Sequence, residues 1–145
     1  MKVSARNQLT GTVSDIVIGA VNAEVHLALK GGEILVASIT KESVESLAIK
    51  TGMNVLALVK APQMILVTDF GGYRLSARNQ LQGTVVEVKS GPVNAEVDLE
   101  LPGGEKLAAT VTNESVVALG LRKGQLATAI FKAGSTSKRR ARRSR

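Results

Sequence analysis

The sequence predicts an all-β protein built from two tandem five-stranded β-barrel modules, each with one short helix. Three observations support this fold class. The chain repeats itself at an offset of 72 residues, short runs with alternating apolar residues end at glycine turns, and a helix-start signal precedes the last strand of each copy. The elements below are taken in chain order from the first copy.

The repeat is clearest in the hexapeptide SARNQL, which occurs at 4–9 and again at 76–81. The match runs without a gap from 4–61 onto 76–133, and roughly half of the paired positions are identical. The chain therefore divides into a first module at 1–61, a linker with a strand at 62–75, a second module at 76–133 and a basic tail at 134–145 that is expected to be disordered.

Most of each module is predicted to be strand. Residues 24–29 alternate between polar or small and apolar side chains, as a half-buried strand does. Gly31-Gly32 predicts a hairpin turn with 33–39 as the returning strand, and the apolar run 54–60 predicts a strand buried on both faces.

A short helix is predicted between these last two strands, in the segment TKESVESLAIKTG. Thr40 suits the N-cap, Glu42 suits the positive first turn, and Lys50-Thr51-Gly52 is expected to end the helix. The second copy repeats the plan as TNESVVALGLRKG. About five short strands with one small helix per module favour a small closed barrel of the OB type.

Composition limits the class of protein. The chain has no cysteine, so it forms no disulfide or thiolate metal site. The start MKVSARNQ has no apolar signal region and no apolar run approaches about 18 residues, so we expect a soluble, cytoplasmic protein without a membrane partner. Modules this small favour packing against each other or oligomerisation.

The net charge of +7 comes almost entirely from the end of the chain. The last nine residues, SKRRARRSR, hold six basic groups, which leaves 13 basic against 12 acidic residues in the rest. Such a block binds polyanions weakly, so nucleic acid is expected as a partner only weakly through the tail, if at all.

The polar residues on which the two copies agree are mainly hydrogen-bond donors. Thr40 and Ser43 lie at the predicted helix start, where free backbone N–H groups favour an anion. Lys60 ends a strand and adds a positive charge beside the N–H of Ala61. A pocket that is rich in donors and poor in acceptors suits an unprotonated oxyanion better than monohydrogen phosphate, whose O–H needs an acceptor.

At this point the segments SARNQLTGTV, GAVNAEV, TKES and VKAP resemble the molybdate-binding Mop module. Two such modules without a DNA-binding domain resemble the molbindin family. The resemblance implies an OB-like fold, a homotrimer, and molybdate or tungstate bound between modules for cytoplasmic molybdenum storage and homeostasis. It also implies the ligands Ser4, Arg6, Thr40, Ser43, Lys60, Ala61, Ser76, Arg78, Thr112, Ser115, Lys132 and Ala133. A further oxyanion site on the threefold axis is implied near Val21, Asn22, Val93 and Asn94.

The same residues have simpler interpretations. Serine and threonine at a helix start are often plain caps, Arg6 and Arg78 suit an ordinary interface, and Asn22 and Asn94 suit turns. His26 aligns with Asp98, so a metal-cation site shared by the copies is not expected.

Three other functions compete with oxyanion binding. A nucleic-acid-binding OB module would stack bases on aromatic side chains, but the chain has only Phe70, Tyr73 and Phe131. An enzyme with a Ser43–Lys60 dyad lacks a recurring His or Asp base, so no catalysis is expected. An isolated effector domain of a molybdate-responsive regulator is the remaining alternative.

Overall fold

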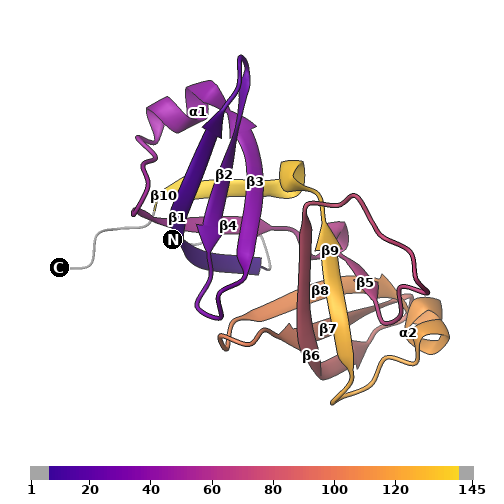
Figure 1. Cartoon of the computed structure of the whole chain (residues 1–145). Helices are drawn as coiled ribbons and strands as arrows, with labels where there is room; N and C mark the ends of the chain where they lie inside the picture. Colours follow the sequence, from indigo (N-terminus) through magenta and orange to yellow (C-terminus); the bar gives the residue numbers. More distant parts are fainter. Residues whose placement is uncertain (1–6, 141–145) are drawn as a thin grey trace.

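The computed structural model describes residues 7–140, which form two β-barrels that lie side by side (Figure 1). The first module contributes β1 (Asn7–Ile18), β2 (Asn22–Ala28), β3 (Ile34–Thr40), α1 (Lys41–Ser46) and β4 (Asn54–Val59). The second module contributes β6 (Asn79–Ser90), β7 (Asn94–Glu100), β8 (Lys106–Thr112), α2 (Asn113–Leu119) and β9 (Leu126–Phe131). This mostly-β architecture with one short α-helix per module confirms the predicted fold class.

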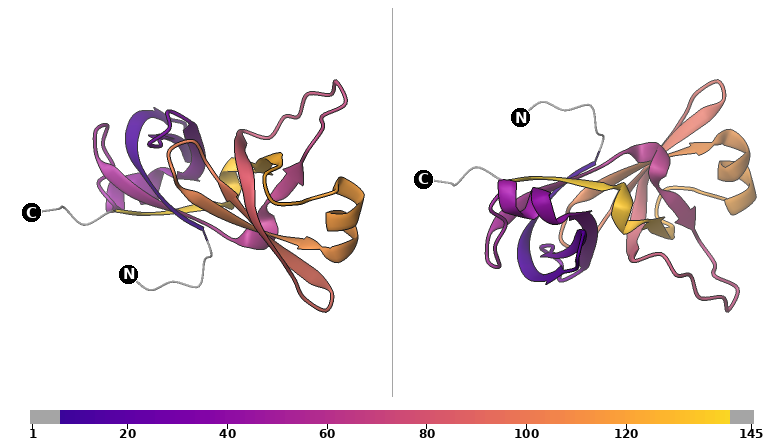
Figure 2. Two further views of the ribbon diagram at one scale, coloured as in Figure 1. Left: turned by 90° about the horizontal axis from the view of Figure 1, so that it is seen from below. Right: turned by 90° about the horizontal axis from the view of Figure 1, so that it is seen from above.

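Two further strands follow the modules, each after a single 3₁₀ turn. The turn η1 (Ala61–Gln63) leads into β5 (Ile65–Val67), and η2 (Ala133–Ser135) leads into β10 (Thr136–Arg140). Each of these strands leaves the module that it follows, and Figure 2 shows both crossings from two sides.

The crossing strands complete the opposite barrels. The strand orders are β10-β4-β1-β2-β3 and β5-β9-β6-β7-β8. β10 pairs antiparallel with β4, from Thr136 opposite Val59 to Arg140 opposite Val55, and β5 pairs with β9 through Ile65 opposite Ile130. β10 also lies close to β3, and β5 lies close to β8, so each exchanged strand covers the gap between the first and last strands of the other module's barrel without a backbone ladder to the last strand. The two modules therefore do not form separable barrels.

The disorder expected for the tail at 134–145 is wrong for Thr136–Arg140, which form β10. The edge of β4 carries backbone N–H and C=O groups that need partners, and the backbone of β10 supplies them. Residues 141–145 lie outside the described part of the chain.

The core follows the alternation seen in the sequence. Val25 and Leu27 of β2 are fully buried, and so are Val97 and Leu99 at the equivalent positions of β7. α1 ends earlier than the sequence suggests, with Leu47 as C-cap instead of a stop at 50–52. Within residues 7–140, no helix is long and apolar enough to cross a membrane.

The two barrels touch through their β2–β3 and β7–β8 hairpin turns. A Cβ built on Gly31 would lie 2.8 Å from the backbone nitrogen of Gly103, and one built on Gly103 would lie 2.5 Å from that of Gly31. The backbone N–H of Lys30 donates to Glu105 Oε2 at 3.1 Å. The glycines recur in both copies because the turns meet backbone to backbone.

Candidate functional site

Each helix start presents a linked pair of hydroxyl groups. Thr40 is the N-cap of α1: its Oγ1 accepts from the backbone N–H of Ser43 at 3.0 Å and donates to Ser43 Oγ at 2.7 Å. This leaves the hydroxyl proton of Ser43 free to donate elsewhere. Thr112 and Ser115 form the same pair in α2, with 3.1 Å for the cap and 2.8 Å between the hydroxyl oxygens. Both predicted caps are confirmed.

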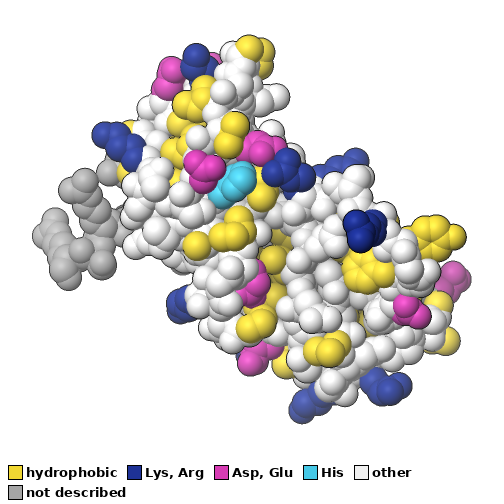
Figure 3. Space-filling model, in the orientation of Figure 1, with side chains coloured by type: hydrophobic (Ala, Val, Ile, Leu, Met, Phe, Trp, Pro, Cys, Tyr) yellow, Lys and Arg dark blue, Asp and Glu magenta, His cyan; other side chains and the backbone are white. Residues whose placement is uncertain are grey.

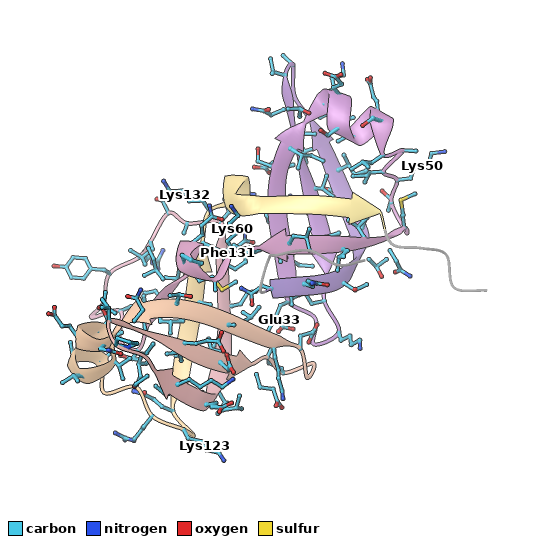
Figure 4. All side chains as sticks on the ribbon, turned by 180° about the vertical axis from the view of Figure 1, so that it is seen from behind. Glu33, Lys50, Lys60, Lys123, Phe131 and Lys132 are labelled. Atoms are coloured by element: carbon cyan, nitrogen blue, oxygen red, sulfur yellow. The ribbon has the colours of Figure 1, made fainter. Side chains whose placement is uncertain are left out.

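The lysine–alanine pairs lie at the junction of the barrels, where the chain passes from one module to the other (Figure 4). Lys60 and Lys132 are exposed, whereas Ala61 and Ala133 are buried at the first position of η1 and η2. The N–H groups at the start of such a turn have no partner within it. Each pair thus offers an exposed cationic donor beside a backbone N–H donor.

Each lysine–alanine pair lies beside the strand that leads to the helix start of the other module, not beside that of its own module. η1 packs against β8, the strand that ends at Thr112, and η2 packs against β3, the strand that ends at Thr40. The sequence grouped Lys60 with Thr40 of its own module. The exchanged segments instead bring Lys60 to the side of the second barrel and Lys132 to the side of the first.

Arg78 makes an ion pair across the junction. Its guanidinium donates to both carboxylate oxygens of Glu24 on β2, at 2.8 and 3.2 Å. Two of its five N–H groups are used in this pair, which leaves three for another acceptor. The interface interpretation of Arg78 therefore holds in this chain, alongside the ligand role that the family resemblance implies. Ser76 is exposed nearby in sequence, and Ser4 and Arg6 lie outside the described residues.

The loops before β2 and β7 adjoin the two helix starts. Asn22 lies opposite Thr40 in the β2–β3 ladder, and the N–H of Lys41 donates to the carbonyl of Val21 at 2.8 Å. Asn94 and Thr112 repeat the first contact, and Val93 and Asn113 the second at 3.0 Å. Val21 and Val93 are 71% and 70% exposed, so both loops end in an apolar tip.

Three residues of the junction were missed by the sequence reasoning. Glu24 was treated only as a polar position of the predicted strand 24–29, although it recurs as Glu96 in the second copy. Asn7 and Asn79, the last letter of SARN in each copy, are 1% and 0% exposed and bind across the junction. Their presence at equivalent positions of both copies was the available signal. In the described part of the chain, no group of three or more His, Asp or Glu residues is placed to hold a metal cation.

Comparison with known proteins agrees with the repeat. Residues 3–66 and 75–137 each match the model of the TOBE domain. The chain belongs to the TOBE-domain family, with two copies in tandem. It is 51% identical to a solved structure of the cytoplasmic molybdate-binding protein ModG with molybdate bound, with a TM-score of 0.92, and the match covers 95% of this chain and 98% of that one. The predicted membership of the molbindin family is thereby confirmed.

Longer relatives contain the same tandem. The chain is 46% identical over 133 residues to the molybdenum transport protein ModE of Herbaspirillum seropedicae, covering 92% of this chain and 49% of that protein. It is 44% identical over 133 residues to the molybdenum-pterin-binding protein MopA of Rhodobacter capsulatus, covering 92% and 50%. This tandem TOBE chain thus spans about half the length of these curated relatives.

Proposed function

We propose that this tandem TOBE protein binds molybdate or tungstate as the free oxyanion and serves molybdenum storage and homeostasis in the cytoplasm. The observation that carries the proposal is the repeated, donor-rich set of groups at the junction, in a chain that is 51% identical over 95% of its length to a molybdate-bound structure. Such groups bind an anion and do not activate a nucleophile, so we infer no catalytic activity.

Two equivalent sites follow from the regrouping at the junction. The first comprises Thr40 and Ser43 of one module with Ser76, Arg78, Lys132 and Ala133 of the other. The second comprises, by the repeat, Thr112, Ser115, Lys60, Ala61, Ser4 and Arg6. Hydroxyl, ammonium and backbone donors match the oxygens of a tetrahedral dianion, which carries no proton of its own.

We further propose a homotrimer of three 15.2 kDa chains, in which neighbouring chains cover the apolar tips at Val21 and Val93. An oxyanion site on the resulting axis would then be lined by Asn22 and Asn94, whose amides donate to anions. Light scattering at micromolar concentration tests this assembly, and a stable monomer would contradict it.

A second candidate function rests on the match to ModE proteins, of which the chain spans about half, because one of them is a DNA-binding transcriptional dual regulator of Escherichia coli, 36% identical over 137 residues. In that case the tandem is the oxyanion-sensing half of a larger regulator, and the site residues are the same. The two candidates differ in DNA binding: specific binding of a DNA site that changes with molybdate would favour a regulator.

The decisive experiment is calorimetric titration with molybdate, tungstate, sulfate and phosphate, with native mass spectrometry for stoichiometry. Lys60→Ala and Lys132→Ala each delete a charge-assisted hydrogen bond worth about 1.5–3 kcal/mol, so each should weaken its own site roughly 10- to 100-fold. Ser43→Ala deletes a neutral one and should cost less, up to about 1.5 kcal/mol. A folded double lysine variant that binds molybdate like the parent would show that the site lies elsewhere.

A further inference from the structure

Two buried asparagines join the barrels by the same pair of hydrogen bonds in both directions. Asn79 Oδ1 accepts from the N–H of Val36, and Asn79 Nδ2 donates to the carbonyl of Val36, both at 2.7 Å. Asn7 binds Ala108 in the same way, at 2.6 and 2.8 Å. Val36 and Ala108 lie at equivalent positions of β3 and β8, the last strands in their sheet orders.

A carboxamide fits this place because it offers one donor and one acceptor side by side, as a neighbouring strand would. Each asparagine thereby satisfies both backbone groups of one residue on an open strand edge. Aspartate would set a negative oxygen against the carbonyl, and an apolar residue would leave two buried backbone groups unpaired. The requirement is specific to asparagine.

The backbone of each asparagine lies in the rung next to a lysine–alanine pair. Asn79 is opposite Phe131 in the β6–β9 ladder, immediately before Lys132, and Asn7 is opposite Val59, immediately before Lys60. Asn79 therefore holds the start of η2 against β3, which continues from Val36 to its end at Thr40. By the repeat, Asn7 holds the start of η1 against β8, which continues from Ala108 to its end at Thr112.

We propose that Asn79 and Asn7 are positioning residues for opposite oxyanion sites. Asn79 sets the distance between the Lys132 segment and the Thr40 hydroxyl pair, and Asn7 sets the distance between the Lys60 segment and the Thr112 pair. This inference rests on the proposed oxyanion-binding function. The new element is that each asparagine controls the geometry of one site, while both asparagines also stabilise the contact between the modules.

A purely structural role predicts a different result. If the carboxamides only stabilise the contact between the modules, removing either one destabilises the whole junction and lowers the molybdate affinity of both sites to the same extent. If they position donors, each substitution weakens one site and spares the other. Site selectivity is therefore the readout that separates the two roles.

The experiment uses two single-site parents of the full chain. Thr112→Ala/Ser115→Ala keeps the site with Thr40, and Thr40→Ala/Ser43→Ala keeps the site with Thr112. Asn79→Leu and Asn7→Leu are introduced into each parent, and molybdate affinity is measured by calorimetry. Asn79→Leu should weaken the first parent about tenfold or more and change the second less than about twofold, and Asn7→Leu should do the reverse.

Controls keep the outcomes distinct. Val97→Ala, which opens a cavity in the core of the second barrel, should lower the melting temperature and leave the difference between the parents unchanged. If either leucine variant does not fold, the alanine variant, which leaves room for water, replaces it. Equal losses in both parents, or none, overturn the positioning role. Parents that do not bind molybdate at all overturn the proposed function instead.

Discussion

The two modules agree where they meet and differ where they face solvent. Both keep the buried asparagine that binds the last strand of the other module, Asn7 in one copy and Asn79 in the other. Both also keep the threonine–serine cap, the lysine–alanine pair and the glycine turn that contacts the opposite turn. On the outer face of β1 and β2, however, Val17 and His26 stand where β6 and β7 have Lys89 and Asp98. At the junction the two copies make equivalent contacts with each other and therefore need the same residues, whereas the outer faces take no part in these contacts and differ.

The outer faces now have different electrostatics. In the first module Glu24 binds Arg78 and lies 3.6 Å from His26 Nε2, and Figure 3 shows the only histidine of the chain among acidic and basic side chains. In the second module Lys89 lies within 3.6–3.9 Å of Glu87, Glu96 and Asp98, and these three carboxylates raise the pKa of Lys89. The first face carries a histidine beside Glu24, and the second carries a lysine among acids.

The largest effect should come from removing the exchanged strand at the C-terminus. Ending the chain at Gly134 deletes β10, exposes the edge of β4 and opens the first barrel, at a cost of about 2–5 kcal/mol for several lost backbone hydrogen bonds. Ending it at Arg140 keeps the strand and serves as the matched control. Thermal melts followed by circular dichroism measure both, and equal melting temperatures would show that β10 contributes nothing to the first barrel.

Contact between the glycine turns should give the next effect, and it should be equal in the two modules. Gly31→Ala and Gly103→Ala each force a methyl group against the backbone of the opposite turn, so each should destabilise the fold by about 1–3 kcal/mol. Gly134→Ala, where a Cβ would meet nothing within 4 Å, is the control. A clear difference between the two turn variants in urea unfolding would break the symmetry of the junction.

The helix ends offer a smaller contrast, because the two copies use different residues in the same backbone conformation. Gly120 caps α2 with a φ of 61°, and the equivalent Ala48 has a φ of 52°. A left-handed conformation costs an alanine about 1 kcal/mol relative to glycine. Ala48→Gly should therefore stabilise the protein by up to about 1 kcal/mol, and Gly120→Ala should destabilise it by a similar amount. Urea unfolding of the two variants should give opposite signs, and shifts of the same sign would contradict this account.

Sequence reasoning predicted what depends on local chemistry. The caps at Thr40 and Thr112, the strands with period-two burial and the glycine turns all follow from short-range rules, and all are present. The exchange of β5 and β10 was not predicted, because pairing partners far apart in the chain leave no periodic signal. That exchange also moved Lys60 away from Thr40, so the grouping of the site residues could not be read from their order.

The smallest effect concerns Asp98, whose environment differs most from its counterpart. Partial burial raises the pKa of Asp98, and Glu96 adds to the rise, while Lys89 opposes it. A carboxyl group whose pKa is raised in the folded state favours folding when it is protonated. Its contribution to stability is therefore present at low pH and is lost as the pH rises above 3.8, the ordinary pKa of the group. Asp98→Asn removes this loss. The variant should therefore gain stability relative to the parent as the pH rises from 3 to 7.

Lys89→Val gives the second module the residue that the first has at this position, and it sharpens the same test. Without the lysine, ionised Asp98 loses a favourable opposite charge, so the gain from Asp98→Asn at pH 7 should be larger in the Lys89→Val background than in the parent. Urea unfolding at pH 3 and pH 7 of the four proteins gives the comparison as a double-mutant cycle. Two results would contradict this account: a gain in unfolding free energy from Asp98→Asn that is the same at pH 3 and pH 7, or a gain that becomes smaller when Lys89 is removed. Either would mean that burial, Glu96 and Lys89 do not control the pKa of Asp98.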